Sequence, residues 1–372
     1  MNPKDAPAPE NAQRNLLFAL HGLYRACGYR AFRMSKFEKY EVYAACKDFL
    51  VSDRVLTFTD TDGELLALKP DVTLSILRAV PYRPGITQRL SYHENVYRPG
   101  PPDGRFREMP QSGVECLGDL DSLDVYEVLK LADESLRLLP CETALSFSHL
   151  GILRALLNRL SADEKDRDEI LRLVAARSVH GLSALFRRRG FPEAVLHSLC
   201  ELLALDCALE ELPDRLREIG AAFPESPVLG ELEELAALAE GDGCRARFDF
   251  SVLNDTHYYN GLVFRGYARG ISDKVLSGGR YDRLLRRMDR PGGAVGFAVY
   301  LGLLSVLNTA DDVSVDADVL VLYDENTPLT LVRDQCAVLR ARGKRVYAQR
   351  RLDDSLRFAE VLDLREGGKS RA

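Results

Sequence analysis

The sequence predicts an α+β fold in which an antiparallel sheet is flanked by helices, with a helical insertion and a small C-terminal α/β piece. Up to about residue 150, short β-rich segments alternate with amphipathic helical patterns. From about 151 to 240, Leu, Ala, Arg and Glu dominate and β-branched residues become rare, which indicates consecutive helices. Strand patterns resume at Ala246, and a strand–helix repeat closes the chain.

The N-terminal elements follow from local patterns. Residues 1–11 are polar and proline-rich, so we expect disorder there. Apolar residues at helical spacing from Leu16 to Cys27 predict a helix that begins near Asn11 and ends at Gly28. Further on, the sequence predicts strands at 55–59 and 65–69, a helix at 71–80, strands at 88–97 and 105–118 joined by the hairpin 99–104, and an amphipathic helix at 121–139.

Beyond the insertion, the patterns predict strands at 246–253 and 262–267, a turn at Gly278-Gly279, and an apolar strand running into a helix at 295–307. After a linker at 313–318, we expect a strand at 319–323, a helix at 328–342, a strand at 345–348 and a final helix at 353–364. The predicted organisation is a disordered N-terminus (1–11), a core (12–312) with its insertion (about 151–240), and a βαβα domain (313–372).

Composition narrows the class of protein. The 372 residues are 46% hydrophobic and 28% charged, and the net charge of -6 is mildly unfavourable for binding nucleic acid. The eight cysteines are scattered without a C-x-x-C pair, which argues against a zinc ribbon and for reduced, mostly buried thiols. With neither an apolar signal core nor a run of about 18 apolar residues, we expect a cytoplasmic protein with no membrane segment. Histidine spacing and the lack of a Walker loop predict no metal and no cofactor.

Three blocks carry residues suited to binding. In Leu68-Lys-Pro-Asp-Val-Thr73, a carboxylate at Asp71 could hold an ammonium group, although an acid in the first turn of a helix also favours the helix dipole. The block from Val96 to Glu115 contains Arg98, Gln111 and Glu115, and its alternative interpretation is a tight hairpin between two strands. The third block, 249–282, contains the pair Tyr258-Tyr259, which could flank a flat ring.

In their order and spacing these blocks resemble the class II core of histidyl-tRNA synthetases over most of residues 15–308. The resemblance implies a class II aminoacyl-tRNA synthetase-like fold and a truncated anticodon-binding-like C-terminal domain. It further implies that Asp71 and Thr73 hold the amino group of histidine, that Arg98 contacts the ATP phosphate, and that Gln111 and Glu115 line the amino-acid pocket. The candidate histidine-binding residues are Asp71, Thr73, Arg98, Gln111, Glu115, Tyr258 and Tyr259.

The sequence departs from that family where ATP chemistry is performed. Asn254 stands where the family has an arginine that supports attack of the histidine carboxylate on ATP, and His257 replaces an acid. Leu303 lies closest to the place of the arginine that stacks on ATP. Charge that develops in a transition state needs cationic donors, which a neutral amide and a leucine do not supply. We therefore predict no catalytic residues.

A synthetase core with these losses resembles the regulatory subunits of short-form ATP phosphoribosyltransferase, which act in the first step of histidine biosynthesis. The resemblance implies a non-catalytic chain that activates a separate catalytic subunit, mediates feedback by L-histidine, forms a homodimer within a hetero-oligomer and binds no tRNA. Two alternatives stay open for the activity: a divergent histidyl-tRNA synthetase, or another histidine-activating, adenylate-forming enzyme. A third alternative concerns the site: the candidate histidine-binding residues would form an empty pocket, and regulation would act at a subunit interface instead.

Overall fold

The computed structural model describes residues 10–44, 54–100, 103–220, 227–253, 258–304, 307, 315–353 and 355–365. The chain divides into a large unit, Glu10–Leu307, and a smaller unit that contains the residues from Asn308 onward. The expectation of disorder at 1–11 falls mainly on residues 1–9, which lie outside the described part, whereas Glu10 and Asn11 already belong to a helix.

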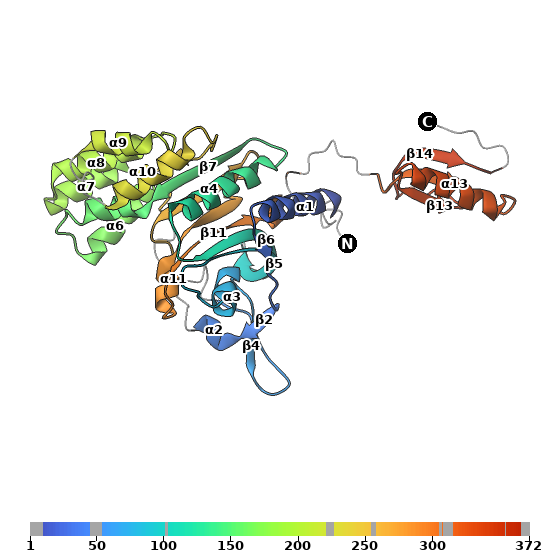
Figure 1. The fold of residues 1–372 in the computed structure, drawn as a ribbon, viewed down its shortest axis with the longest axis horizontal. Coiled ribbons are helices and arrows are strands. Elements are labelled where there is room, and N and C mark those ends of the chain that lie inside the picture. The colour runs from blue at the N-terminus through green and yellow to red at the C-terminus, as the bar shows by residue number, and fades with distance from the viewer. Residues whose placement is uncertain are drawn as a thin grey trace. The chain divides into compact units, whose positions relative to one another are not determined.

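An eight-stranded sheet forms the centre of the large unit (Figure 1). Its inner strands pair antiparallel, as predicted, and only the two edge pairs, β1 with β5 and β7 with β8, are parallel. The order across the sheet is β1 (Arg30–Ala31), β5 (Thr87–Gly100), β6 (Arg105–Gly118), β11 (Gly293–Tyr300), β10 (Leu276–Arg280), β9 (Leu262–Ala268), β7 (Thr143–His149) and β8 (Arg247–Phe248).

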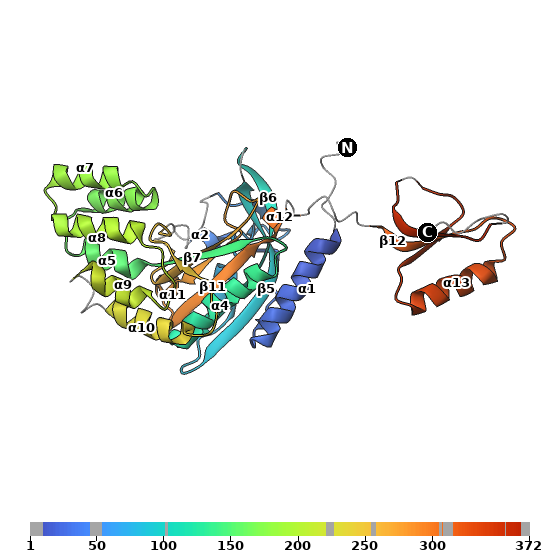
Figure 2. The same cartoon turned by 90° about the horizontal axis from the view of Figure 1, so that it is seen from above.

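Helices cover both faces of this sheet, one of which is turned toward the viewer in Figure 2. On one face lie α1 (Glu10–Ala26) and α4 (Ser122–Arg137), whose apolar residues pack on Val114, Val295 and Phe297 of the inner strands. On the other face lie α3 (Val72–Ala79) and α11 (Asp282–Arg287), packed against Leu90, Leu117 and Ala294. The helix α12 (Leu301–Leu304) directly continues β11, so the predicted strand running into a helix is confirmed.

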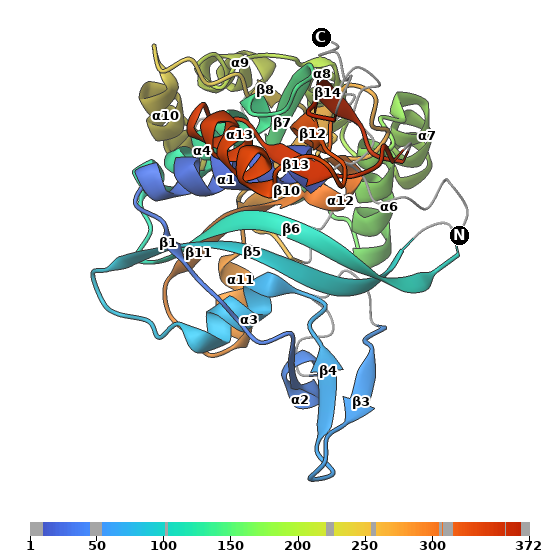
Figure 3. The same ribbon diagram turned by 90° about the vertical axis from the view of Figure 1, so that its right-hand side faces the viewer.

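A smaller antiparallel sheet stands beside the second face (Figure 3). It consists of β2 (Phe37–Lys39), β4 (Leu65–Leu68) and β3 (Thr57–Thr59), and α2 (Tyr40–Ala44) follows β2 directly. Strand β4 leads through Lys69 and Pro70 into α3, so this sheet sets where α3 begins.

The insertion is helical, as its composition predicted. After β7 the chain forms α5 (Leu150–Leu157), α6 (Glu164–Ala175), α7 (Val179–Arg189), α8 (Glu193–Ala204), α9 (Leu212–Ile219) and α10 (Pro227–Ala239). Leucines from these helices join the same apolar core as α4 and the main sheet, so the insertion is part of the large unit's core.

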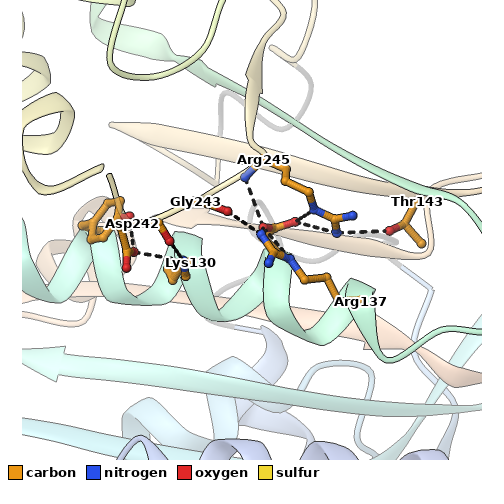
Figure 4. A network of polar contacts seen from close by, with 8 residues as sticks. Lys130, Arg137, Thr143, Asp242, Gly243 and Arg245 are labelled. Atoms are coloured by element: carbon orange, nitrogen blue, oxygen red, sulfur yellow. Dashed lines mark hydrogen bonds and ion pairs between the residues drawn. The ribbon is translucent and has the colours of Figure 1, made fainter. Parts of the chain in front are cut away.

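Ionic contacts fasten the segment that returns from the insertion to the sheet (Figure 4). Asp133 of α4 is only 1% exposed and accepts hydrogen bonds from the side chains of Arg137, at 2.6 Å, and Arg245, at 3.0 Å. About two helical turns earlier on α4, Tyr126 donates to Asp242 at 2.6 Å. A buried carboxylate needs such partners, so α4 fixes the course of residues 242–245.

The small unit differs from the βαβα prediction. It contains β12 (Ala317–Leu322), α13 (Leu329–Ala341), β13 (Val346–Gln349) and β14 (Phe358–Asp363), with the strand order β13-β12-β14 and parallel pairing throughout. The helix predicted at 353–364 is therefore wrong, because Phe358–Asp363 pairs with the free edge of β12. Backbone pairing between distant segments has overridden the local pattern.

The turn predicted at Gly278-Gly279 is also wrong, since both glycines lie inside β10. A Cβ atom on Gly278 would lie 2.5 Å from the Gly296 carbonyl oxygen and 2.5 Å from the Phe264 ring. These glycines therefore permit close packing rather than a change of direction. Among the described residues, no helix has both the length and the apolar character needed to cross a bilayer.

Candidate functional site

The first part of the site forms at the start of α3. Asp71 is the N-cap of this helix, and its side chain accepts a hydrogen bond from the backbone N–H of Leu74 at 3.0 Å. Its second carboxylate oxygen lies 2.9 Å from Nη2 of Arg98 on β5. Arg98 also donates through Nε to the carbonyl oxygen of Pro70. Asp71 thus serves both as the helix cap and as the partner of the candidate phosphate-binding arginine.

Glu115 on β6 is the centre of the site and is 2% exposed. Thr73 Oγ1 donates to Glu115 Oε1 at 2.6 Å, and the Tyr281 hydroxyl donates to Oε2. Gly296 lies opposite Glu115 on β11, and a Cβ there would come within 1.9 Å of Oε2. The carboxyl group therefore occupies a place that only glycine at position 296 leaves open.

Burial controls the protonation of this carboxyl group. It raises the pKa of Glu115 to about 8, against the opposing effect of the hydrogen bonds from Thr73 and Tyr281, and the negative charge of Asp71 adds to the rise. Burial likewise raises the pKa of Tyr258 and of Tyr281 well above the usual range. In the unliganded protein at neutral pH, Glu115 is therefore largely a neutral acid beside neutral tyrosines.

Three tyrosine rings cluster beside this carboxyl group. The ring centroids of Tyr258 and Tyr259 are 4.9 Å apart, and those of Tyr258 and Tyr281 are 5.4 Å apart. Asn254 and His257 lie outside the described residues. We call Asp71, Thr73, Arg98, Glu115, Tyr258 and Tyr281 the Glu115 cluster.

Gln111 occupies the same face of β6 as Glu115, because their positions differ by four and strand side chains alternate between faces. It is buried and lies opposite Glu94 of β5 and Tyr300 of β11. The structure thus brings the predicted residues together in one region, with Gln111 further along the strand than the Glu115 cluster.

Sequence reasoning missed two residues of the cluster's immediate surroundings. Tyr281 lies in the third block, 249–282, and is absent from the candidate binding residues, although its hydroxyl donates to Glu115. Gly296 opens the Gly-Phe-Ala-Val-Tyr300 stretch, where a glycine in an otherwise apolar strand signals a close approach.

The chemistry of the Glu115 cluster suits a small polar cation. Two carboxyl groups and three hydroxyl groups supply acceptors for ammonium or imidazolium N–H donors. Arg98 is already paired with Asp71, so a phosphate would have to compete with that carboxylate. At Leu303, within α12, the side chain is apolar and half-buried and offers no cation. Over the described ranges, no group of three His, Cys, Asp or Glu side chains is placed to hold a metal ion.

Comparison with known proteins places this geometry in context. The family model described as Histidyl-tRNA synthetase matches residues 2–304. A histidine--tRNA ligase of Methanocaldococcus jannaschii is 27% identical over 352 residues, which cover 91% of this chain and 83% of the relative. An ATP phosphoribosyltransferase regulatory subunit of Moorella thermoacetica is 30% identical over 305 residues, which cover 79% of this chain and 77% of the relative.

One solved structure resembles nearly the whole chain. It is a Bacillus halodurans protein described as an ATP phosphoribosyltransferase regulatory subunit/histidyl-tRNA synthetase, with a TM-score of 0.78 and 25% identity. The match covers 95% of this chain and 94% of that protein. The predicted class II synthetase-like fold and the resemblance to both groups of proteins are confirmed.

Proposed function

The chain belongs to the histidyl-tRNA synthetase family, and from this premise we propose that it is a non-catalytic regulatory subunit of an ATP phosphoribosyltransferase. One observation carries the proposal. The acceptors of the Glu115 cluster and Arg98 are kept, while two other arginines expected for ATP are replaced by Asn254 and Leu303. A site that keeps its binding groups and lacks two of the cations expected for adenylate formation suits ligand sensing rather than catalysis. The similarity to the Moorella regulatory subunit supports the same role.

In this proposal L-histidine is the effector. Asp71 and Thr73 receive its ammonium group, Gln111 and Glu115 face its imidazole, and Tyr258 and Tyr259 flank the ring. Binding of a cationic group would favour the ionised form of Glu115, because an opposite charge lowers the pKa of a carboxyl group. The proton that leaves Glu115, whose carboxyl group has a pKa of about 8, would pass to the imidazole that it faces, so that a carboxylate meets an imidazolium.

The partner is the catalytic subunit that joins ATP to phosphoribosyl pyrophosphate, and the chain acts as a homodimer within a cytoplasmic hetero-oligomer that binds no tRNA. Histidine inhibits only if it binds the less active arrangement of the complex more tightly. A coupling free energy of about 1–3 kcal/mol changes the relative populations roughly 5–150-fold. If the Glu115 cluster stays empty, regulation acts at the subunit interface instead.

The test is phosphoribosyl-ATP formation by the short catalytic subunit, with and without this chain, across a histidine titration. Activation, or newly acquired histidine sensitivity, supports the proposal. Glu115→Ala and Tyr258→Ala are expected to weaken histidine inhibition while the complex still forms. Tyr267→Ala, at an exposed position of β9, is the matched control and should inhibit normally. No effect of the chain on rate or on inhibition would exclude this function.

A second candidate follows from the similarity to the Methanocaldococcus ligase, which extends over 91% of this chain. A histidyl-tRNA synthetase, or another histidine-activating adenylate-forming enzyme, must exchange pyrophosphate into ATP when histidine is present. Histidine-dependent exchange by the purified chain would favour this alternative over the regulatory role.

A further inference from the structure

The segment Arg280–Tyr281–Asp282 joins the Glu115 cluster to the rest of the large unit. Tyr281 points to Glu115, whereas its two neighbours in sequence pair with each other, with Arg280 Nε 2.9 Å from Asp282 Oδ2. Asp282 Oδ1 also accepts from the backbone N–H of Ala294 at 3.0 Å. Side-chain contacts of Arg280 and Asp282 therefore hold the chain on both sides of Tyr281, in addition to the backbone bond from Tyr281 N–H to the Ala294 carbonyl oxygen.

One of those contacts comes from the helical insertion. Glu231 of α10 has its Oε1 atom 3.3 Å from Nη1 of Arg280. Burial opposes ionisation of Glu231, but the contacts with His149 and Arg280 outweigh it and lower the pKa of this carboxyl group. Glu231 is therefore an anion that holds the outer end of the Arg280 guanidinium while Asp282 holds the inner end.

The same carboxylate also faces the junction where the insertion leaves the sheet. Its Oε2 atom lies 3.3 Å from Nε2 of His149, the last residue of β7. Nδ1 of His149 accepts from the backbone N–H of Gly151 at 3.1 Å, so the proton of a neutral ring is on Nε2, toward Glu231.

The packing at this junction is tight. A Cβ atom on Gly151 would lie 2.4 Å from Val228 of α10, so α10 approaches the first turn of α5 closely. Because α10 is packed so closely, we expect a displacement of one of its residues to move the whole helix.

We propose that Glu231 is a positioning residue for the Glu115 cluster: through Arg280 it holds the segment that directs the Tyr281 hydroxyl onto Glu115. This coupling is a property of the unliganded chain, and only its effect on histidine rests on the proposed function. Because coupling is reciprocal, a ligand that repositions Tyr281 shifts the preferred place of α10. Ligand binding at the Glu115 cluster would then change the position of α10 in the insertion, and so alter the surface of the protein.

The experiment follows the titration of Glu115 in the full-length protein by NMR of labelled glutamate carboxyl carbons, with the signal assigned by its loss in Glu115→Gln. The Tyr281 hydrogen bond favours the carboxylate, so Tyr281→Phe should move the titration midpoint up by roughly 1 pH unit. Glu231→Gln should move it in the same direction. The double variant Glu231→Gln/Tyr281→Phe should add nothing to the shift of Tyr281→Phe alone, because both changes remove one contact.

Glu233→Gln is the matched control. This residue lies on the same helix, and its ion pair is with Arg217 of α9 rather than with Arg280, so the midpoint should stay where it is. If Glu231→Gln does not fold, Arg280→Lys gives the same test, because an ammonium group cannot serve Asp282 and Glu231 with the fork of a guanidinium.

Two results would overturn the proposal: a wild-type midpoint in Glu231→Gln, or shifts that add fully in the double variant. Histidine binding by calorimetry separates this inference from the proposed function. If the wild-type protein binds histidine and the Glu231→Gln variant binds it roughly 10-fold more weakly, the result supports both the effector role of histidine and the positioning role of Glu231. A wild-type protein that binds no histidine excludes the effector role, and the shift of the Glu115 midpoint still decides whether Glu231 positions Tyr281.

Discussion

Gly296→Ala tests whether Glu115 occupies the place that the structure gives it. The added Cβ would lie 1.9 Å from Glu115 Oε2 and 2.4 Å from the carbonyl oxygen of Val114. A comfortable carbon–oxygen contact is about 3.3 Å, so the carboxyl group must retreat by about 1.4 Å. A shift of that size disrupts the hydrogen bonds that Thr73 and Tyr281 donate to the carboxyl group, because they hold it in its present place.

Overpacking of a core costs about 1–3 kcal/mol, and two lost hydrogen bonds add about 1 kcal/mol each. We expect the free energy of unfolding to fall by about 3–5 kcal/mol, measured by urea denaturation at pH 7. The control is Gly230→Ala on α10, where a Cβ meets nothing within 4 Å, and it should stabilise by about 0.5–1 kcal/mol. A Gly296→Ala protein within about 0.5 kcal/mol of the wild type would show that Glu115 does not lie against β11.

Three further predictions concern buried ionisable side chains. Burial raises the pKa of Glu115 from 4.5 to about 8, so the unfolded chain releases this proton at a lower pH than the folded chain does. As pH rises from 4.5 to 8, the free energy of unfolding therefore falls by on the order of 4 kcal/mol. Relative to the wild type, Glu115→Gln should therefore gain stability between pH 5 and pH 8 in urea denaturation, and a constant difference would contradict the assignment. In the same assay, Asp133→Asn should lower the free energy of unfolding by about 2–3 kcal/mol. Asp206→Asn, which removes an exposed ion pair, should change it by no more than about 0.5 kcal/mol. Equal losses in the two variants would show that burial of Asp133 does not matter. Lys69→Met leaves Glu94 without its buried cation and should cost about 3 kcal/mol, most of it recovered in thermal denaturation of the Lys69→Met/Glu94→Gln double variant; no recovery would mean that packing, not charge, is lost.

Local patterns predicted the elements whose causes are local. The helix expected at 121–139 is α4, Ser122–Arg137, because its apolar stripe and its capping residue Asp121 both lie within the segment. The long hairpin of β5 and β6 could also be predicted from the sequence, because its turn residues lie between two strand patterns.

The errors arose where the cause lies elsewhere in the chain. The local sequence around Gly278 predicts a turn, but the glycine is needed because Phe264 and Gly296 pack against it. The β14 segment pairs with a strand about 40 residues earlier in the chain, which its own sequence does not indicate. The site was predicted from resemblance as a set of positions, but Tyr281 could not be chosen from spacing, because it is separated from Glu115 by 166 residues. A glycine or a tyrosine in one sequence does not indicate which distant atom it will meet.

The placement of the insertion between β7 and β9 has a consequence for how the chain folds. These strands are neighbours in the sheet, with His149 opposite Leu262, so their pairing closes a loop on the order of 100 residues. Closing so long a loop is entropically costly, and sheets built from such distant pairs assemble slowly. The six insertion helices make mostly local contacts and can collapse early, which draws the two strands together before they pair. We therefore expect the insertion to act during folding as an internal scaffold for the sheet that carries the Glu115 cluster.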